Sequence, residues 1–234
     1  MRDGLGRFMK GHTPPPKDEK WRASLSKRQS KYPPPILEPS MDLAYILGVA
    51  LGDGSVTDKG KYHRITLGVK DKPFAESFVR ALNGIGLYNC CVHRHPSRDM
   101  WFVDIYNRAL VKRVVELRTR LGEFLETPGL QLAFLRGFYE SEGSYHKSKD
   151  KYREETIKIY NSNEDLLKFV GQLLRGLGFY FHFRTSTRIN RQGLLHLIGR
   201  EHTTYYLVTG RRAQVYRFLQ EVKPCIKRPV VSIS

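Results

Sequence analysis

Apolar and polar positions follow two different periods along the chain, and the order of these periods repeats. Residues 41–51 form an apolar run with the length of a buried helix, and residues 130–140 form a second one. Each run is followed by a stretch in which apolar and polar residues alternate, ending at residues 65–69 and 157–160. The pattern predicts a helix followed by a strand pair in each half, with one face of each strand buried and the other exposed.

The remaining segments continue in the same order in both halves. The expected elements are a helix (residues 74–83 and 165–175), a second hairpin (90–105 and 181–208) and a basic helix (110–117 and 213–221). The predicted fold is α+β, with two pseudo-symmetric half-domains of the order αββαββα.

Identical or similar residues recur at a constant spacing. Five positions recur 89 residues later (from 44 to 133), where Ala44, Gly48, Gly52, Asp53 and Gly54 are matched by Ala133, Gly137, Ser141, Glu142 and Gly143. A second block, residues 80–88, recurs at 172–180 with an offset of 92 (from 80 to 172). The connection between the blocks is therefore three residues longer in the second half. We predict half-domains at residues 41–127 and 128–234.

Basic residues are in large excess. Lys and Arg number 40 against 23 Asp and Glu, which gives a formal net charge of +17. Such an excess is expected where a protein displaces counterions from phosphates, so nucleic acid is the leading class of partner. A ribosome-associated or membrane-surface protein would share this charge, but an aromatic content of 12% argues against a simple basic tail.

Residues 1–40 differ from the rest in composition. Two proline triplets, at 14–16 and 33–35, bracket a basic stretch with few core-forming residues. This composition is compatible with a disordered leader and with an arm that contacts DNA. We interpret the segment as a DNA-contacting arm.

Cysteine content and hydropathy restrict the cellular compartments in which the protein is expected. Cys90, Cys91 and Cys225 are an odd set without CxxC spacing, so neither a disulfide framework nor a zinc site is predicted. No apolar run approaches the roughly 20 residues of a membrane span. We expect a soluble intracellular protein of the cytoplasm, nucleoid or an organelle matrix, without a membrane partner.

Both predicted central helices carry a stripe of small residues at a spacing of four. The stripes are Ala44, Gly48 and Gly52 in the first helix and Ala133, Gly137 and Ser141 in the second. Small residues allow helix backbones to approach closely, so the two helices are predicted to pack stripe against stripe. A glycine within a helix costs about 1 kcal/mol relative to alanine, which indicates a geometric requirement here.

An acidic residue follows each stripe. Gly54 and Gly143 are expected to end the helices in the left-handed conformation, which places Asp53 and Glu142 at the helix C-termini. Two acids side by side at the negative ends of helix dipoles repel each other unless divalent cations lie between them. A lone acid before glycine is usually a turn residue, but its duplication at matched positions favours a paired metal site.

The two helix-end segments resemble the paired motifs of LAGLIDADG homing endonucleases of the two-motif monomeric type. Residues 47–54 and 135–143 carry the resemblance, and the repeat covers nearly all of the chain after residue 40. The resemblance implies a DNA-binding saddle whose central helices form the interface between the halves. It also implies a monomer, without an obligate protein partner, that cuts a long and roughly asymmetric duplex DNA site and leaves 3′ overhangs.

The resemblance also implies a metal-dependent active site. Asp53 and Glu142 would bind Mg²⁺ with Gly52 and Ser141, at two phosphodiesters across the minor groove. Mn²⁺ is expected to substitute for Mg²⁺, and Ca²⁺ is expected to bind without efficient cleavage.

Two further residues match auxiliary catalytic positions of the family. Lys70 matches its lysine in the first half, although a solvated lysine at a strand end is an alternative interpretation, and Asn161 matches its polar residue in the second. Val69 stands where a Gln or Asn is expected, and Ser162 stands at the position that corresponds to Lys70. The two active sites are therefore predicted to be unequal.

Polar residues of the strands are candidates for DNA contacts. They are Arg64, Thr66, Lys70, Lys158, Tyr180, His182, Arg184 and Ser186. Each is compatible with base readout and with a contact to phosphate or solvent.

Two other functions are compatible with the same fold. One is an RNA maturase that assists intron splicing, and the other is a DNA-binding regulator without catalysis. A regulator would be expected to lose Asp53 or Glu142, and both are retained. The acids therefore favour the nuclease.

Overall fold

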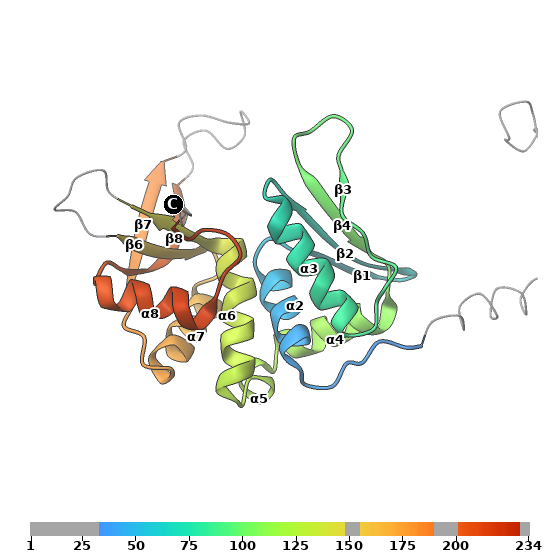
Figure 1. The fold of residues 1–234 in the computed structure, drawn as a ribbon, viewed down its shortest axis with the longest axis horizontal. Coiled ribbons are helices and arrows are strands. Elements are labelled where there is room, and N and C mark those ends of the chain that lie inside the picture. The colour runs from blue at the N-terminus through green and yellow to red at the C-terminus, as the bar shows by residue number, and fades with distance from the viewer. Residues whose placement is uncertain (1–32, 148–154, 190–200, 230–234) are drawn as a thin grey trace, which may run out of the picture. The chain divides into compact units, whose positions relative to one another are not determined.

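Two α+β repeats follow one another along the part of the chain that the computed structural model describes, residues 33–147, 155–189 and 201–229 (Figure 1). The proposed DNA-contacting arm lies outside the described residues over positions 1–32. Residues 35–234 belong to one compact unit. Among the described residues, no helix is both long enough and apolar enough to cross a membrane.

Both repeats have the predicted order αββαββα, which confirms the α+β fold. The first comprises α2 (Met41–Leu51), β1 (Ser55–Lys59), β2 (Tyr62–Val69), α3 (Lys72–Gly84), β3 (His93–Arg94), β4 (Trp101–Ile105) and α4 (Arg108–Arg118). The second comprises α6 (Pro128–Glu142), β5 (Gly143–His146), β6 (Thr156–Asn161), α7 (Glu164–Gly176), β7 (His182–Ile189), β8 (Glu201–Thr209) and α8 (Arg212–Val222). The short helix α5 (Leu121–Phe124), between the repeats, was not predicted.

Each repeat forms a four-stranded antiparallel sheet with helices on one face. The strand orders are β1-β2-β4-β3 and β5-β6-β8-β7, so the two sheets have equivalent topology. Helices α3 and α4 cover the first sheet, and α7 and α8 cover the second (Figure 1). In β2 the side chains of Ile65, Leu67 and Val69 are buried beneath these helices, whereas Arg64 and Thr66 lie on the uncovered face. The alternation of the sequence thus sets the two faces of the sheet.

The central helices α2 and α6 begin with polar caps. Ser40 Oγ accepts a hydrogen bond from the Leu43 amide at 3.2 Å, and Thr127 Oγ1 accepts one from the Leu130 amide at 3.4 Å. Pro128 follows Thr127 at the first helical position, where its missing N–H has no intrahelical partner to lose. These caps fix the N-terminal ends of the two helices.

Helices α2 and α6 lie side by side in direct backbone contact (Figure 1). A Cβ atom on Gly48 would lie 2.2 Å from the Phe134 carbonyl oxygen, and one on Gly137 would lie 2.3 Å from that of Tyr45. Either distance is too short for real atoms, so both positions require glycine. Ala44 is fully buried, and Ala133 is half-buried.

The prediction that Gly54 and Gly143 end the helices in the left-handed conformation is wrong. Gly143 has φ −83° and ψ 164°, and Gly54 is not among the glycines with positive φ. Steric contact explains the glycines instead, because a Cβ on Gly54 would lie 2.6 Å from Ala50 Cα. A Cβ on Gly143 would meet the Tyr139 ring at 2.1 Å. At both positions the glycine is required by close contact with the last turn of its own helix.

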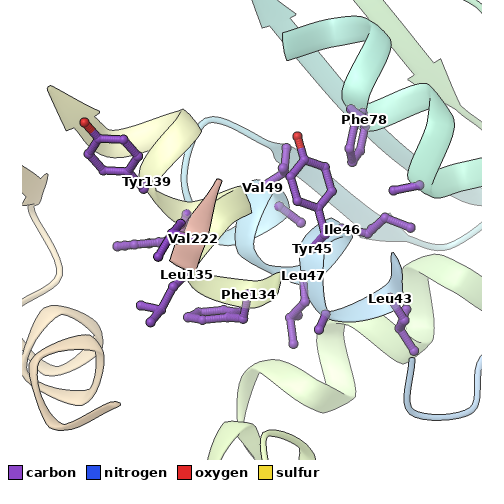
Figure 2. Close-up of a cluster of buried hydrophobic side chains, with 14 of the residues drawn as sticks. Leu43, Tyr45, Ile46, Leu47, Val49, Phe78, Phe134, Leu135, Tyr139 and Val222 are labelled. Atoms are coloured by element: carbon purple, nitrogen blue, oxygen red, sulfur yellow. The ribbon is translucent and has the colours of Figure 1, made fainter. Parts of the chain in front are cut away.

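A single hydrophobic core includes residues of both repeats. Figure 2 shows side chains of α2 and α6 within it, including Leu47, Phe134 and Leu135. Phe134 and Phe138 stack at 5.9 Å between ring centroids. Because the core is shared, the helix pair is held by apolar burial as well as by backbone contact.

Candidate active site between the two repeats

The ends of α2 and α6 bring the two predicted acids together. Gly52 caps α2, and a Cβ on it would lie 2.4 Å from Ser141 Cβ and 3.1 Å from Glu142 Cγ. Asp53 follows Gly52 directly, so the Asp53 and Glu142 carboxyl groups both lie where the C-terminal ends of α2 and α6 meet. The close helix contact is therefore the feature that pairs the acids.

The two carboxyl groups have different surroundings. Burial raises the pKa of Glu142 to about 7, the nearby Asp53 charge adds to the rise, and Lys227 and Asn161 oppose it. Partial burial also raises the pKa of Asp53, and Lys227 lowers it. Asp53 is the more exposed of the two acids. Simultaneous ionisation of both groups is therefore unfavourable, and a cation would relieve their repulsion.

Asn161 lies beside Glu142. Its Nδ2 donates to Glu142 Oε1 at 3.0 Å, and its Oδ1 accepts from the Asn163 amide at 2.8 Å. Asn161 ends β6 just as Val69 ends β2, and the buried Val69 side chain has no polar group to offer Asp53. The surroundings of the two acids are thus unequal.

Lys227 lies at the acid pair, although the sequence did not single it out. Its Nζ donates to the Ser141 carbonyl oxygen at 2.5 Å, and its own carbonyl accepts from Tyr139 Oη at 2.7 Å. Burial lowers the pKa of Lys227, and the charges of Asp53 and Glu142 raise it. Lys227 follows α8, outside both repeated motifs, and is one of 40 Lys and Arg residues. No sequence signal distinguished it.

Lys70, the lysine predicted to assist catalysis, lies at the end of β2. It is exposed and directly follows β2, and within the described residues it makes neither a hydrogen bond nor an ion pair with Asp53 or Glu142. Ser162, its counterpart in the second repeat, is exposed as well. The lysine found near the acids is therefore Lys227, and a role for Lys70 stays a prediction.

A buried acid holds the segment that carries Lys227. Glu140 is fully buried and accepts hydrogen bonds from Tyr45 Oη, from Arg136 Nε at 3.1 Å and from the Cys225 amide at 2.6 Å. Arg136 also donates from Nη2 to Ser77 Oγ on α3 at 3.0 Å. The network joins α2, α3 and α6 to the chain after α8, and so places Lys227 at the acids.

The uncovered faces of the sheets carry most of the predicted DNA-contacting residues. Register places Lys158 of β6 and His182 of β7 on either side of Val208, and Arg184 opposite Tyr206. Ser186 shares this face of β7.

Aromatic rings lie on the same face of the second sheet, next to the basic residues. The Lys158 ammonium lies 5.6 Å from the centroid of the Tyr206 ring, which lies 5.5 Å from the Tyr160 ring. Tyr180 differs from the rest of the predicted set: it is exposed but precedes β7, and its amide donates to Gln214 Oε1 at 3.1 Å.

The donor set suits a hard divalent cation. Asp53 and Glu142 offer carboxylate oxygens at one point, and the Ser141 carbonyl lies beside them. Among the described residues, no group of three or more His, Cys, Asp or Glu side chains could hold a metal ion. A cation here would therefore keep water or phosphate oxygens in its shell, as Mg²⁺ commonly does.

Two pseudo-equivalent repeats that pair acids at their central helix ends define a class of α+β protein. The sequence pattern of the LAGLIDADG-like domain matches residues 40–117 and 129–223, one match for each repeat. The chain therefore belongs to the LAGLIDADG-like family, as its motifs predicted.

Individual relatives agree with this assignment. The chain is 33% identical over 153 residues to the uncharacterized protein MJ0314 of Methanocaldococcus jannaschii, covering 62% of this chain and 57% of that protein. The homing endonuclease I-DmoI in complex with DNA and Ca is similar in structure, with a TM-score of 0.53, 20% identity and coverage of 82% and 94%. The N-terminal LAGLIDADG domain of DUF199/WhiA is similar as well, with a TM-score of 0.52, 13% identity and coverage of 82% and 85%. At these identities, the two structures establish a shared fold.

Proposed function

We propose that this protein is a site-specific DNA endonuclease that hydrolyses one phosphodiester in each strand of a duplex. The observation that carries the proposal is the pairing of Asp53 and Glu142 at the contact of α2 and α6, with Lys227 beside them. A fold used only for binding would have no need to keep two acids in partial burial at a surface that faces a polyanion.

Charge supports DNA as the substrate. The formal net charge of +17 favours binding to phosphates, and the uncovered sheet faces carry basic and aromatic side chains. I-DmoI, which shares the fold, has been crystallised with DNA and Ca and with DNA and Mn. We infer that residues 41–127 and 128–234 act as half-domains that each contact one half of an asymmetric site, as a monomer.

Each residue of the site would have a different role in the reaction. Asp53 and Glu142 would hold Mg²⁺ or Mn²⁺, which when bound activates water and neutralises charge on the scissile phosphate. Asn161 fixes the orientation of the Glu142 carboxyl group through Oε1. Lys227 places a positive charge beside both acids, where it would oppose the charge that develops on a reacting phosphate.

A catalytically inactive DNA-binding regulator is the second candidate. The fold alone is compatible with such a role, because a fold does not determine function. The retained acids favour the nuclease, because an inactive regulator has no use for carboxyl groups that repel DNA phosphates.

The proposal can be tested by separating binding from cleavage. A target site would be selected from a randomised duplex library in Ca²⁺ and then placed in a supercoiled plasmid with Mg²⁺. We expect linear product from the parent chain and no cleavage in EDTA. Asp53→Asn and Glu142→Gln should each reduce linearisation at least about 100-fold while the affinity in Ca²⁺ changes little, because each amide keeps the shape and removes the charge that holds the cation.

Glu123→Gln is the matched control. Glu123 is an exposed acid on α5 that pairs with Arg120 and lies outside both motifs, so the cleavage rate of this variant should equal that of the parent. Nicked product from one variant would show that the two strands are cut by partly independent groups. Parental linearisation by Asp53→Asn or Glu142→Gln would remove that acid from the mechanism.

A further inference from the structure

Arg64 is held in a fixed position on the uncovered face of the first sheet. Its Nε and Nη2 both donate to Oδ1 of Asp104, at 3.1 Å and 2.6 Å. The two residues lie on neighbouring strands, β2 and β4, where Asp104 is paired in register with Thr66. The Arg64 side chain is still 42% exposed, so the guanidinium remains accessible from outside the sheet.

Other side chains hold Asp104 in turn. Thr66 Oγ1 donates to Asp104 Oδ1 at 2.8 Å, and His93 Nε2 lies 3.5 Å from its Oδ2. The Arg64 guanidinium carbon also lies 5.5 Å from the centroid of the Tyr106 ring. Burial opposes ionisation of Asp104, but the hydrogen bonds from Arg64 and Thr66 outweigh it and lower the pKa of this carboxyl group. Asp104 is therefore a charged anchor at neutral pH.

The geometry leaves one edge of the guanidinium available. An arginine side chain has five N–H donors in a planar fork, and Asp104 takes those of Nε and one side of Nη2. Within the part of the chain that the structure describes, no other acceptor is bonded to the Arg64 guanidinium group. The remaining edge carries one N–H on Nη1 and one on Nη2, parallel and directed away from Asp104.

Two parallel N–H donors match one base edge in duplex DNA. Guanine presents O6 and N7, two adjacent acceptors, in the major groove, whereas adenine presents one donor and one acceptor there. An arginine that is already fixed loses less side-chain entropy on binding than a free one. The Arg184 side chain on the second sheet has no hydrogen bond or ion pair within the described residues and so lacks this advantage.

We propose that Arg64 reads a guanine in the major groove of the target and that Asp104 is the positioning residue that makes this contact selective. The proposal rests on the proposed function, since it assigns one base contact of that DNA site. It goes further in naming the base, the reading residue and the residue that orients it.

The test compares base preference at every position of the target. The full chain, Asp104→Asn and Arg64→Lys would each select from the same randomised library in Ca²⁺. The parent should prefer guanine strongly at one position, and both variants should reduce that preference about 10-fold while other positions keep theirs. Because a loss of folded protein weakens binding to all sequences equally, the position-specific change distinguishes readout from stability.

Asp99→Asn is the matched control. Asp99 forms an ion pair with Arg94 at 2.8 Å in the β3–β4 connection, and its side chain is 90% exposed. This variant removes the same charge and should leave the whole profile unchanged. An Asp104→Asn profile identical to that of the parent, or one weakened equally at all positions, would overturn the inference. A parent that selects no site at all would instead overturn the proposed function, and the inference with it.

Discussion

The protonation and orientation of Asp53 and Glu142 depend on the residues that the fold places next to them. Asp53 and Glu142 occupy equivalent positions in the two repeats, yet only Glu142 has an amide donor, from Asn161. The duplicated motif was sufficient to select both acids from the sequence. Lys227 was not predicted, because its place depends on the path of the chain after α8 and on no pattern in its own segment.

Glu142 gives a prediction for pH dependence. Its pKa is about 7 in the folded protein against a reference value of 4.5, so between these values the folded state binds more protons than the unfolded state. The stability that this group contributes is fully present below about 4.5 and is lost as the pH rises through 7. We expect the melting temperature of metal-free protein to fall more between pH 5.5 and 8 in the parent than in Glu142→Gln.

Divalent metal should oppose the fall in melting temperature with rising pH, since only the ionised carboxylate binds a cation. Stabilisation of the parent by Mg²⁺ should increase from pH 6 to 8 and be weak in Glu142→Gln at every pH. Equal pH slopes for the two proteins without metal would contradict the raised pKa.

At the scale of elements, the contact between α2 and α6 is set by backbone atoms. Gly48 and Gly137 each face a carbonyl oxygen of the other helix at a distance that excludes a Cβ atom. The repeated spacing of small residues predicted this contact. It did not predict the backbone conformation of Gly54 and Gly143, because steric proximity and positive φ both select glycine and look alike in a single sequence.

Gly48→Ala tests the contact. The added methyl group would lie 2.2 Å from the Phe134 carbonyl oxygen, so the helices must separate. Overpacking costs about 1–3 kcal/mol, and a clash with a backbone atom places it at the upper end, well above the gain of about 1 kcal/mol in helix propensity. We expect the free energy of unfolding, measured by urea denaturation, to fall by about 2 kcal/mol.

The control for Gly48→Ala is Gly176→Ala. Gly176 ends α7 and has no positive φ, and a Cβ atom added to it would have nothing within 4 Å. Its replacement should keep or raise the stability by up to about 1 kcal/mol. If both variants were equally stable, close packing would not be the reason for Gly48.

At the scale of the whole molecule, one buried acid connects elements of both repeats. Glu140 joins Tyr45 of α2, Arg136 of α6 and the Cys225 amide after α8. Burial raises the pKa of the Cys225 thiol to about 11, with the Glu140 charge adding to the effect. The segment that carries Cys225 and Lys227 is therefore held by elements of both repeats.

Glu140→Gln should weaken this connection. The amide keeps one acceptor but loses the charge that Arg136 and the Cys225 amide bind, so we expect the free energy of unfolding to fall by about 2–3 kcal/mol. Alkylation of Cys225, followed by mass spectrometry of its peptide, should become faster, because the segment opens more often and because the Glu140 charge no longer raises the thiol pKa.

Glu116→Gln is the comparison for that experiment. Glu116 pairs with Arg113 on the exposed side of α4, so its replacement should change the stability by less than about 1 kcal/mol. Unchanged Cys225 labelling in Glu140→Gln would show that other contacts hold the final segment.

The sequence by itself determined the features that depend on local pattern and repetition. Period and cap residues specify the elements, and the recurrence of Gly48 as Gly137 and of Asp53 as Glu142 specifies two equivalent halves. These properties can be predicted because each is set by residues close together in the chain or matched between the repeats.

Tertiary structure alone decided which distant residues meet. Lys227 reaches the acids because Glu140 and Tyr139 hold the segment that carries it, and Asp104 orients Arg64 because β4 pairs with β2. Each of these contacts joins positions about 40 or more residues apart with no matched spacing. Their physical cause is the packing of whole elements, which leaves no periodic trace in the sequence.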